Sequence, residues 1–337
     1  MKTTIHYLSS DNITFYRVIA MSMVVLYHCT CYYAHPSWPF GEGPYNPIMK
    51  LVTTIMGGIH MPVFVFISGY LFWMLKRNGH YKKLTSFYKT KVLRILVPYL
   101  IVGVIMIMLF NHIYNLSSLL YGICHLWFLL MLFGLFILAP VSWMILEKIS
   151  DNQLVTFFVL SSFILYPIFY QVTIFQIVKV FQFLPFFLFG YIIQRRGLRN
   201  LYFDYLFWLS MLFVIMILYV TCSSNLFYGK ILKQFISFLV IIIISLIPNF
   251  DIPISMKKTI NSIAYNSMGL YLVHHIIINY LLLSSTTKAL LDSANCYLAV
   301  TIMFLVTFFS SLLISVIANK YNFTSFIIGS KLKKIKI

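Results

Sequence analysis

The feature that most constrains this chain is a succession of apolar stretches, each long enough to cross a lipid bilayer as one helix. A transmembrane helix needs about 20 predominantly apolar residues. We count ten such stretches, at about 13–33, 50–75, 93–111, 122–146, 154–171, 177–194, 203–222, 233–249, 265–284 and 296–319. The sequence therefore predicts an all-α, polytopic integral membrane protein with about ten transmembrane helices.

The composition agrees with a membrane protein. Hydrophobic residues make up 61% of the 337 residues and charged residues only 9%, whereas soluble domains contain about 25% charged residues. We expect a single transmembrane domain over residues 1–337 and no soluble domain. No internal repeat is visible, so the sequence gives no support for a transporter built from inverted halves.

The net charge of +18 could indicate nucleic-acid binding, but the positions of the basic residues explain it as a topology signal. With the N-terminus inside, the alternation of ten spans puts 20 of the 25 lysines and arginines in inner segments. Basic residues accumulate on the cytoplasmic side of membrane proteins. We therefore expect both termini in the cytoplasm and no nucleic-acid partner. The outer basic residues are Lys50, Lys179, Lys230, Lys233 and Lys288.

Two ionisable residues, Arg17 and His28, bracket the first apolar stretch. Eleven residues at about 100° each place both side chains on nearly the same helix face, about 16 Å apart along the axis. Ionisable residues inside a membrane are costly and indicate function. The alternative is that Arg17 reaches the inner headgroups and His28 marks the outer interface. Spacing alone leaves both interpretations open.

Polar residues on two further apolar stretches favour a polar core. The second stretch contains His60 and the segment FISGY, in which Ser68 and the following glycine allow another backbone or a ligand to approach closely. The ninth contains Tyr271 and His274, which are three residues apart and hence on one helix face. His275 is expected to point about 100° away and to be structural.

The ionisable residues suit histidine chemistry better than carboxylate chemistry. The seven acidic residues all lie outside the middle of the apolar stretches, so we do not expect a carboxylate proton relay. A neutral imidazole can deprotonate a hydroxyl group near neutral pH. His28, Cys29, Cys31 and His35 are close in sequence but lack the spaced positions of zinc ligands, so we expect no metal.

Five motifs in order along the chain resemble those of the membrane acyltransferase-3 family. RVIAMSMVVLYH (17–28) is similar to the R-x10-H signature of that family, with Arg17 and His28 as the pair. The later motifs are FISGYLF (66–72), HLWFLLMLFGLFILAP (125–140), LPFFLFGYII (184–193) and SMGLYLVHHIII (267–278). The third motif is closest to the branch that O-acetylates surface polysaccharides.

The resemblance implies a membrane O-acyltransferase. Such an enzyme moves an acyl group, commonly acetyl from acetyl-CoA, from the cytoplasm to a hydroxyl group of a surface polysaccharide or lipid-linked sugar. His28 would be the general base or a transient acyl carrier. Arg17 would meet a phosphate of the donor or steady its thioester. The family also implies the cytoplasmic (inner) membrane of a bacterium, with the bilayer, acyl-CoA and a glycan acceptor as partners; a homo-oligomer is left open.

Two positions depart from the family pattern. Lys91 and Arg94, in KVLR, stand where many relatives have an R-x-x-R pair on the inner loop. We expect them to hold the nucleotide end of acyl-CoA; the alternative is that they are simple topogenic charge. Lysine keeps the charge but not the bidentate fork that arginine offers to phosphate. Thr14 stands where many relatives have an acidic residue.

The remaining candidates are proposed by residue type. Ser68, Tyr271 and Trp127 could donate hydrogen bonds to the oxyanion of a tetrahedral intermediate, and Ser68 could also contact the cofactor. Trp127 is equally typical of an interfacial anchor. In the outer loop 34–47, Trp38 could stack on a sugar ring and Glu42 could accept bonds from sugar hydroxyls. The alternative for both is a proline-fixed loop packed at the interface.

Two other functions share some of these features. A transporter or flippase of lipid-linked sugars or polysaccharide would have the same span count, basic inner loops and aromatic outer loop. It would need neither an arginine and a histidine on one helix face nor acyl-CoA. A polysaccharide polymerase is typically distinguished by large outer loops with catalytic arginines, and the outer segments here contain no arginine.

Overall fold

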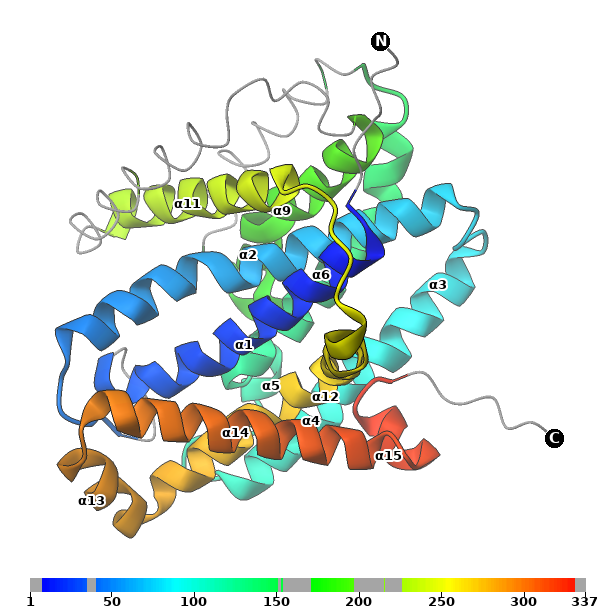
Figure 1. Cartoon of the computed structure of the whole chain (residues 1–337). Coiled ribbons are helices and arrows are strands. Elements are labelled where there is room, and N and C mark those ends of the chain that lie inside the picture. The colour runs from blue at the N-terminus through cyan, green and yellow to red at the C-terminus, as the bar shows by residue number, and fades with distance from the viewer. Residues whose placement is uncertain are drawn as a thin grey trace. The chain divides into compact units, whose positions relative to one another are not determined.

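The computed structural model describes residues 8–34, 41–150, 171–196 and 226–330, and the single residues 153 and 215. All regular secondary structure in these ranges is helical (Figure 1). The chain divides into two compact units. The first comprises Met1–Phe64 and Arg196–Ile314, and the second comprises Val65–Arg195 and Ser315–Ile337. The prediction of an all-α protein is confirmed.

Among the described residues, six helical segments are long and apolar enough to cross a membrane. They are α1 (Ser10–Ala34), α2 (Pro47–Arg77), the run of α3 (Leu84–Lys91), the π-helix η1 (Val92–Leu96) and α4 (Val97–Leu109), then η2 (Cys124–Leu126) with α6 (Trp127–Leu146), η4 (Ile174–Gln176) with α9 (Ile177–Arg196), and α14 (Cys296–Ala318). A seventh span results if α12 (Ile254–Leu283) and α13 (Ser285–Ser293), bent by 87°, are taken together.

These helices cover most of the predicted spans. The span predicted at 233–249 corresponds to α11 (Leu226–Leu246), of which Leu232–Leu246 is the apolar part. Short helices α5 (Ser118–Tyr121) and α15 (Asn322–Ile327) complete the described elements used below. The spans predicted at 154–171 and 203–222 lie almost entirely outside the described residues. The count of ten and the cytoplasmic termini therefore stay predictions.

In the first unit, α1 and α12 run side by side in the same direction. Three polar contacts join residues that are 246 or 247 positions apart, and such a constant offset defines a parallel pair. They are Asp11 with Lys257, Arg17 with Ala264, and His28 with His274. The common direction agrees with the predicted alternation, in which the first and ninth spans cross the bilayer the same way.

Two further helices of the first unit run antiparallel to α1. The hydroxyl of Tyr16 donates to the carbonyl of Ile244 in α11 at 2.9 Å. The first half of α2 contacts α1 through the hydroxyls of Thr53 and Thr30, 2.7 Å apart. Hydrogen bonds between helices are a typical means of association in lipid, where apolar contacts give no net driving force. The polar side of α1 is thus enclosed by α2, α11 and α12.

In the second unit, the later half of α2 crosses α9 with direct contact between backbones. A Cβ atom added at Gly69 would lie 2.1 Å from the carbonyl oxygen of Phe187, and one added at Gly190 would lie 2.4 Å from the backbone nitrogen of Tyr70. Only glycine permits an approach this close. The glycine of FISGY therefore serves the approach of another backbone, which was one of its two predicted roles.

Candidate functional site

Arg17 is held against α12. Its Nη2 donates to the carbonyl oxygen of Ala264 and to the hydroxyl of Ser267, each at 3.1 Å. The side chain is half-buried. The guanidinium is therefore directed toward the neighbouring helix, which fits a polar core better than a side chain that extends only to the headgroups.

His28 is buried between the same two helices, further along α1. Its Nδ1 lies 2.9 Å from the carbonyl oxygen of Val24 and 3.2 Å from Nε2 of His274. His274 is fully buried, and its own Nδ1 lies 2.6 Å from the carbonyl oxygen of Tyr271. The predicted site residues His28, Tyr271 and His274 are thus brought together by the parallel packing of α1 and α12.

The hydrogen bonds assign the protons of this histidine pair. A carbonyl oxygen only accepts, so Nδ1 of His274 carries its proton and donates it to Tyr271. In a neutral imidazole the other nitrogen is then an acceptor, and Nε2 of His274 accepts from Nδ1–H of His28. The same Nδ1–H faces the carbonyl of Val24. The basic lone pair of His28 therefore resides on Nε2.

His275 also contacts His28, contrary to its expected orientation. The centroids of the His28 and His275 rings are 4.9 Å apart, and the two rings are nearly perpendicular. A side chain that packs against α12 between two successive residues touches both, although a helical wheel separates them by about 100°. His60 of α2 extends the group, because the ring of Tyr27 lies 5.0 Å from the rings of both His28 and His60.

The two cations proposed for the nucleotide of acyl-CoA differ in their surroundings. Nζ of Lys91 lies 3.5 Å from the ring centroid of Phe136 and within 5.7 Å of the rings of Tyr81 and Phe87, so its charge is engaged by aromatic faces. Arg94 is exposed on the π-helix η1, and its Nε donates to the carbonyl of Gly329 at 3.2 Å. Arg94 is the better placed of the two for a ligand in solution.

Of the other four predicted site residues, two belong to the second unit, one precedes α2 and one lies outside the described residues. Ser68 is half-buried in the second unit, beside the glycine contact with α9. Trp127, at the start of α6, has Nζ of Lys179 3.6 Å from its ring centroid, which is a cation–π contact. Glu42 is exposed before α2. Trp38 lies outside the described residues.

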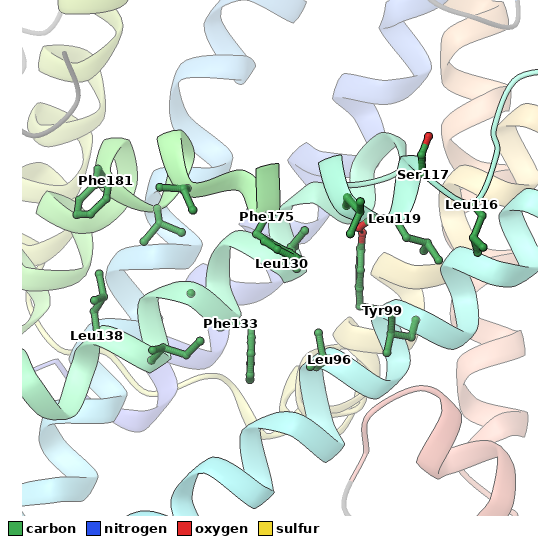
Figure 2. Close-up of a pocket in the computed structure, with 16 residues that line it drawn as sticks. Leu96, Tyr99, Leu116, Ser117, Leu119, Leu130, Phe133, Leu138, Phe175 and Phe181 are labelled. Carbon is green, nitrogen blue, oxygen red and sulfur yellow. The ribbon is translucent and has the colours of Figure 1, made fainter. Parts of the chain in front are cut away.

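The second unit also contains an apolar cavity of about 1090 Å³ between α4, α5, α6 and the start of α9 (Figure 2). Figure 2 shows side chains such as Leu96, Phe133 and Phe181 around it. The hydroxyl of Tyr99 in its lining donates to the carbonyl of Leu119 at 2.5 Å. The described residues that line the cavity are almost all apolar, and such a lining suits a hydrocarbon chain.

The helices and the polar contacts together define a polytopic α-helical membrane protein with a buried core of histidines beside an arginine. Comparison with known families identifies the class: the model of the acyltransferase-3 family, an acyltransferase domain, matches residues 11–320. The chain belongs to this family and is a membrane acyltransferase. No curated protein and no solved structure matches it significantly.

Proposed function

We propose that this protein is an O-acyltransferase that moves an acyl group, acetyl in the simplest case, from cytoplasmic acyl-CoA to a hydroxyl group of a surface polysaccharide or lipid-linked sugar. Family membership supports acyl transfer and disfavours a transporter or flippase. The observation that best supports a histidine-based transfer is the buried contact between His28 and His274. His28 is on the same helix as Arg17.

In direct transfer, Nε2 of His28 takes the proton of the acceptor hydroxyl while the hydroxyl oxygen attacks the thioester carbonyl. The new C–O bond forms, the C–S bond breaks, and the imidazolium returns the proton to the CoA thiolate. Because Nδ1–H of His28 already donates to His274, that hydrogen bond strengthens as His28 becomes positively charged. His274 would thereby stabilise the charged state.

In transfer through an acyl-enzyme, the same nitrogen attacks the thioester and CoA thiolate leaves. The acceptor hydroxyl then attacks the resulting acyl-imidazolium; its C–N bond breaks to restore neutral histidine, and the hydroxyl proton passes to the CoA thiolate. Both routes require the lone pair on Nε2 of His28, so the assigned tautomer is compatible with either. Tyr271, buried next to His274, is a candidate donor to the oxyanion of the intermediate.

The donor would approach from the end of α1 that carries Arg17. This end is the cytoplasmic one in the predicted topology, and the protein is proposed to lie in the cytoplasmic membrane of a bacterium. The Arg17 guanidinium can contact a phosphate or the thioester oxygen while Nη2 remains bound to α12. The exposed guanidinium of Arg94 is the proposed contact for the nucleotide end.

The proposal is tested by NMR of the purified surface polysaccharide from cells that express the wild type, His28→Ala or His112→Ala at matched membrane levels. His112 is an exposed loop histidine and serves as the control. We expect acetyl signals with the wild type and His112→Ala and none with His28→Ala. Persistent acetylation without His28 would rule out its chemical role, and absence of acetyl in all cells would point to another acceptor or to transport.

A further inference from the structure

Lys233 is a charged residue inside the helix bundle that the proposed mechanism does not use. It lies in the apolar part of α11, residues Leu232–Leu246, and is half-buried. It is also one of only five basic residues that the sequence places in outer segments. A lysine in a membrane helix is costly and by default indicates function.

The ammonium group of Lys233 meets α1 and α2 at a glycine. A Cβ atom added at Gly57 would lie 3.3 Å from the ring of Tyr27 and 3.7 Å from Nζ of Lys233. The ammonium group therefore lies next to the position that a side chain at Gly57 would occupy. Gly57 is ten residues from the start of α2, and Lys233 is seven residues from the start of α11. The ammonium group therefore lies against α1 and α2 within the bundle, near its predicted outer side.

The histidine core adjoins this position. Gly57, beside which the ammonium group lies, is three residues before His60 on α2, so the two positions share one helix face. The ring of Tyr27 lies against His60 on one side and His28 on the other, with 5.0 Å between centroids in each case. Lys233 therefore stands at one end of a series of polar side chains that leads through Tyr27 to His28.

The charge of Lys233 lacks a partner in the part of the chain that the structure describes. Among the described carboxylates, none forms an ion pair with it; Asp11, for example, pairs with Lys257. The neighbouring His60 would repel it when protonated. A cation that is partly withdrawn from water and has no counter-ion is unfavourable, because the part of its hydration that is lost is not replaced. A bound anion would supply the missing charge.

We propose that Lys233 binds an anionic group of the acyl acceptor, either the carboxylate of an acidic sugar or the phosphate of a lipid-linked sugar. The inference rests on the proposed function and names the chemical class of its acceptor. Lys233 is on the predicted outer side, from which a glycan approaches, whereas the phosphates of acyl-CoA would meet Arg17 and Arg94. The ammonium group would hold the acceptor beside the histidine core.

The test measures binding without acyl transfer. The purified protein in lipid nanodiscs is heated with increasing glucuronate, glucose 1-phosphate, glucose, or sodium chloride at equal ionic strength. The variants are Lys233→Met, Lys233→Arg and, as a control, Lys50→Met, which removes an exposed outer lysine. A ligand that binds only the folded state raises the unfolding temperature in a saturable manner.

We expect one of the two anionic sugars to raise the unfolding temperature of the wild type and Lys50→Met, and to have no effect on Lys233→Met. Glucose and chloride should have no such effect, and Lys233→Arg should retain part of the response. The sugar that acts distinguishes carboxylate from phosphate. An equal response in Lys233→Met, an equal response to glucose, or no response of the wild type to either anion would overturn the proposal. None of these results depends on whether His28 transfers an acyl group.

Discussion

Nε2 of His274 in α12 lies 3.2 Å from Nδ1 of His28 in the parallel helix α1, although the two residues are 246 positions apart in the chain. The carbonyls of Tyr271 and Val24 complete the hydrogen bonds at the two Nδ1 atoms. The two histidines thus form one hydrogen-bonded unit, in which the carbonyl that faces each Nδ1 atom favours a proton on that atom. In the proposed mechanism, this relationship makes His274 a positioning residue for Nε2 of His28.

Replacement of His274 should therefore lower the rate of acyl transfer without abolishing it. We expect His274→Leu to reduce kcat by about tenfold to a hundredfold, which is less than the 10²–10⁴-fold that a general base can contribute. His274→Gln should recover part of this loss, because its amide oxygen can accept the bond from Nδ1–H of His28. The measurement is initial-rate kinetics on purified variants of equal thermal stability. Equal losses in both variants would mean that His274 acts only through packing.

The rate of acyl transfer should fall even when Arg17 is replaced by lysine. Nη2 of Arg17 donates to both Ala264 and Ser267, and a lysine ammonium lacks the planar fork that makes these two bonds from one guanidinium nitrogen. We expect Arg17→Lys to lose nearly as much activity as Arg17→Gln. Ser267→Ala removes one of the two bonds to the charged guanidinium and should cost about 1.5–3 kcal/mol of stability, with most activity retained. Full activity of Arg17→Lys would show that only the charge matters.

Replacement of Arg94 should weaken the binding of the nucleotide end of acyl-CoA and leave the binding of its pantetheine arm unchanged. Loss of a hydrogen bond to a charged group costs about 1.5–3 kcal/mol, so we expect Arg94→Gln to raise the Kd of CoA by about tenfold to a hundredfold. Isothermal titration with CoA and with pantetheine, which has no nucleotide, separates the two ends of the donor. Lys89→Gln, an exposed lysine on the preceding helix, is the control. A similar loss of affinity for pantetheine would contradict the assigned contact.

The fold could be predicted from the sequence largely because bilayer thickness sets the length of an apolar helix. Helical periodicity likewise predicts that Arg17 and His28 share a face. The partner of that face could not be predicted, since the packing of α1 against α12 joins residues more than 240 positions apart. For the same reason the aromatic faces around Lys91, one of them from Phe136, and the contact of His275 with His28 appear only in the structure.

Lys233 illustrates a different limit of sequence reasoning. In the sequence, Lys233 is one of the outer basic residues that indicate topology. Its distance along the chain from other polar residues predicts no contact. What marks it is the neighbourhood of Gly57, Tyr27 and His60, which come from two other helices. A residue whose significance arises from tertiary contacts leaves no local pattern in the chain.

The glycines of FISGY and LPFFLFGYII should be required for packing. A methyl group at Gly69 would overlap the carbonyl of Phe187, and one at Gly190 would overlap the backbone of Tyr70. A backbone atom cannot rotate away as a side chain can. We therefore expect Gly69→Ala and Gly190→Ala each to lower the free energy of unfolding by at least about 1–3 kcal/mol, the usual cost of an overpacked position. The measurement is the unfolding temperature of the purified variants.

Gly58→Ala is the matched control for this prediction. It lies on the same helix, and its added methyl group would meet only side-chain atoms, at 3.6 Å from Lys233 and 3.8 Å from Ile236, which are ordinary contact distances. Its unfolding temperature should remain near that of the wild type. If Gly69→Ala instead kept its stability and lost acyl transfer, the glycine would serve the approach of a ligand, the second of the two roles that its sequence context allows.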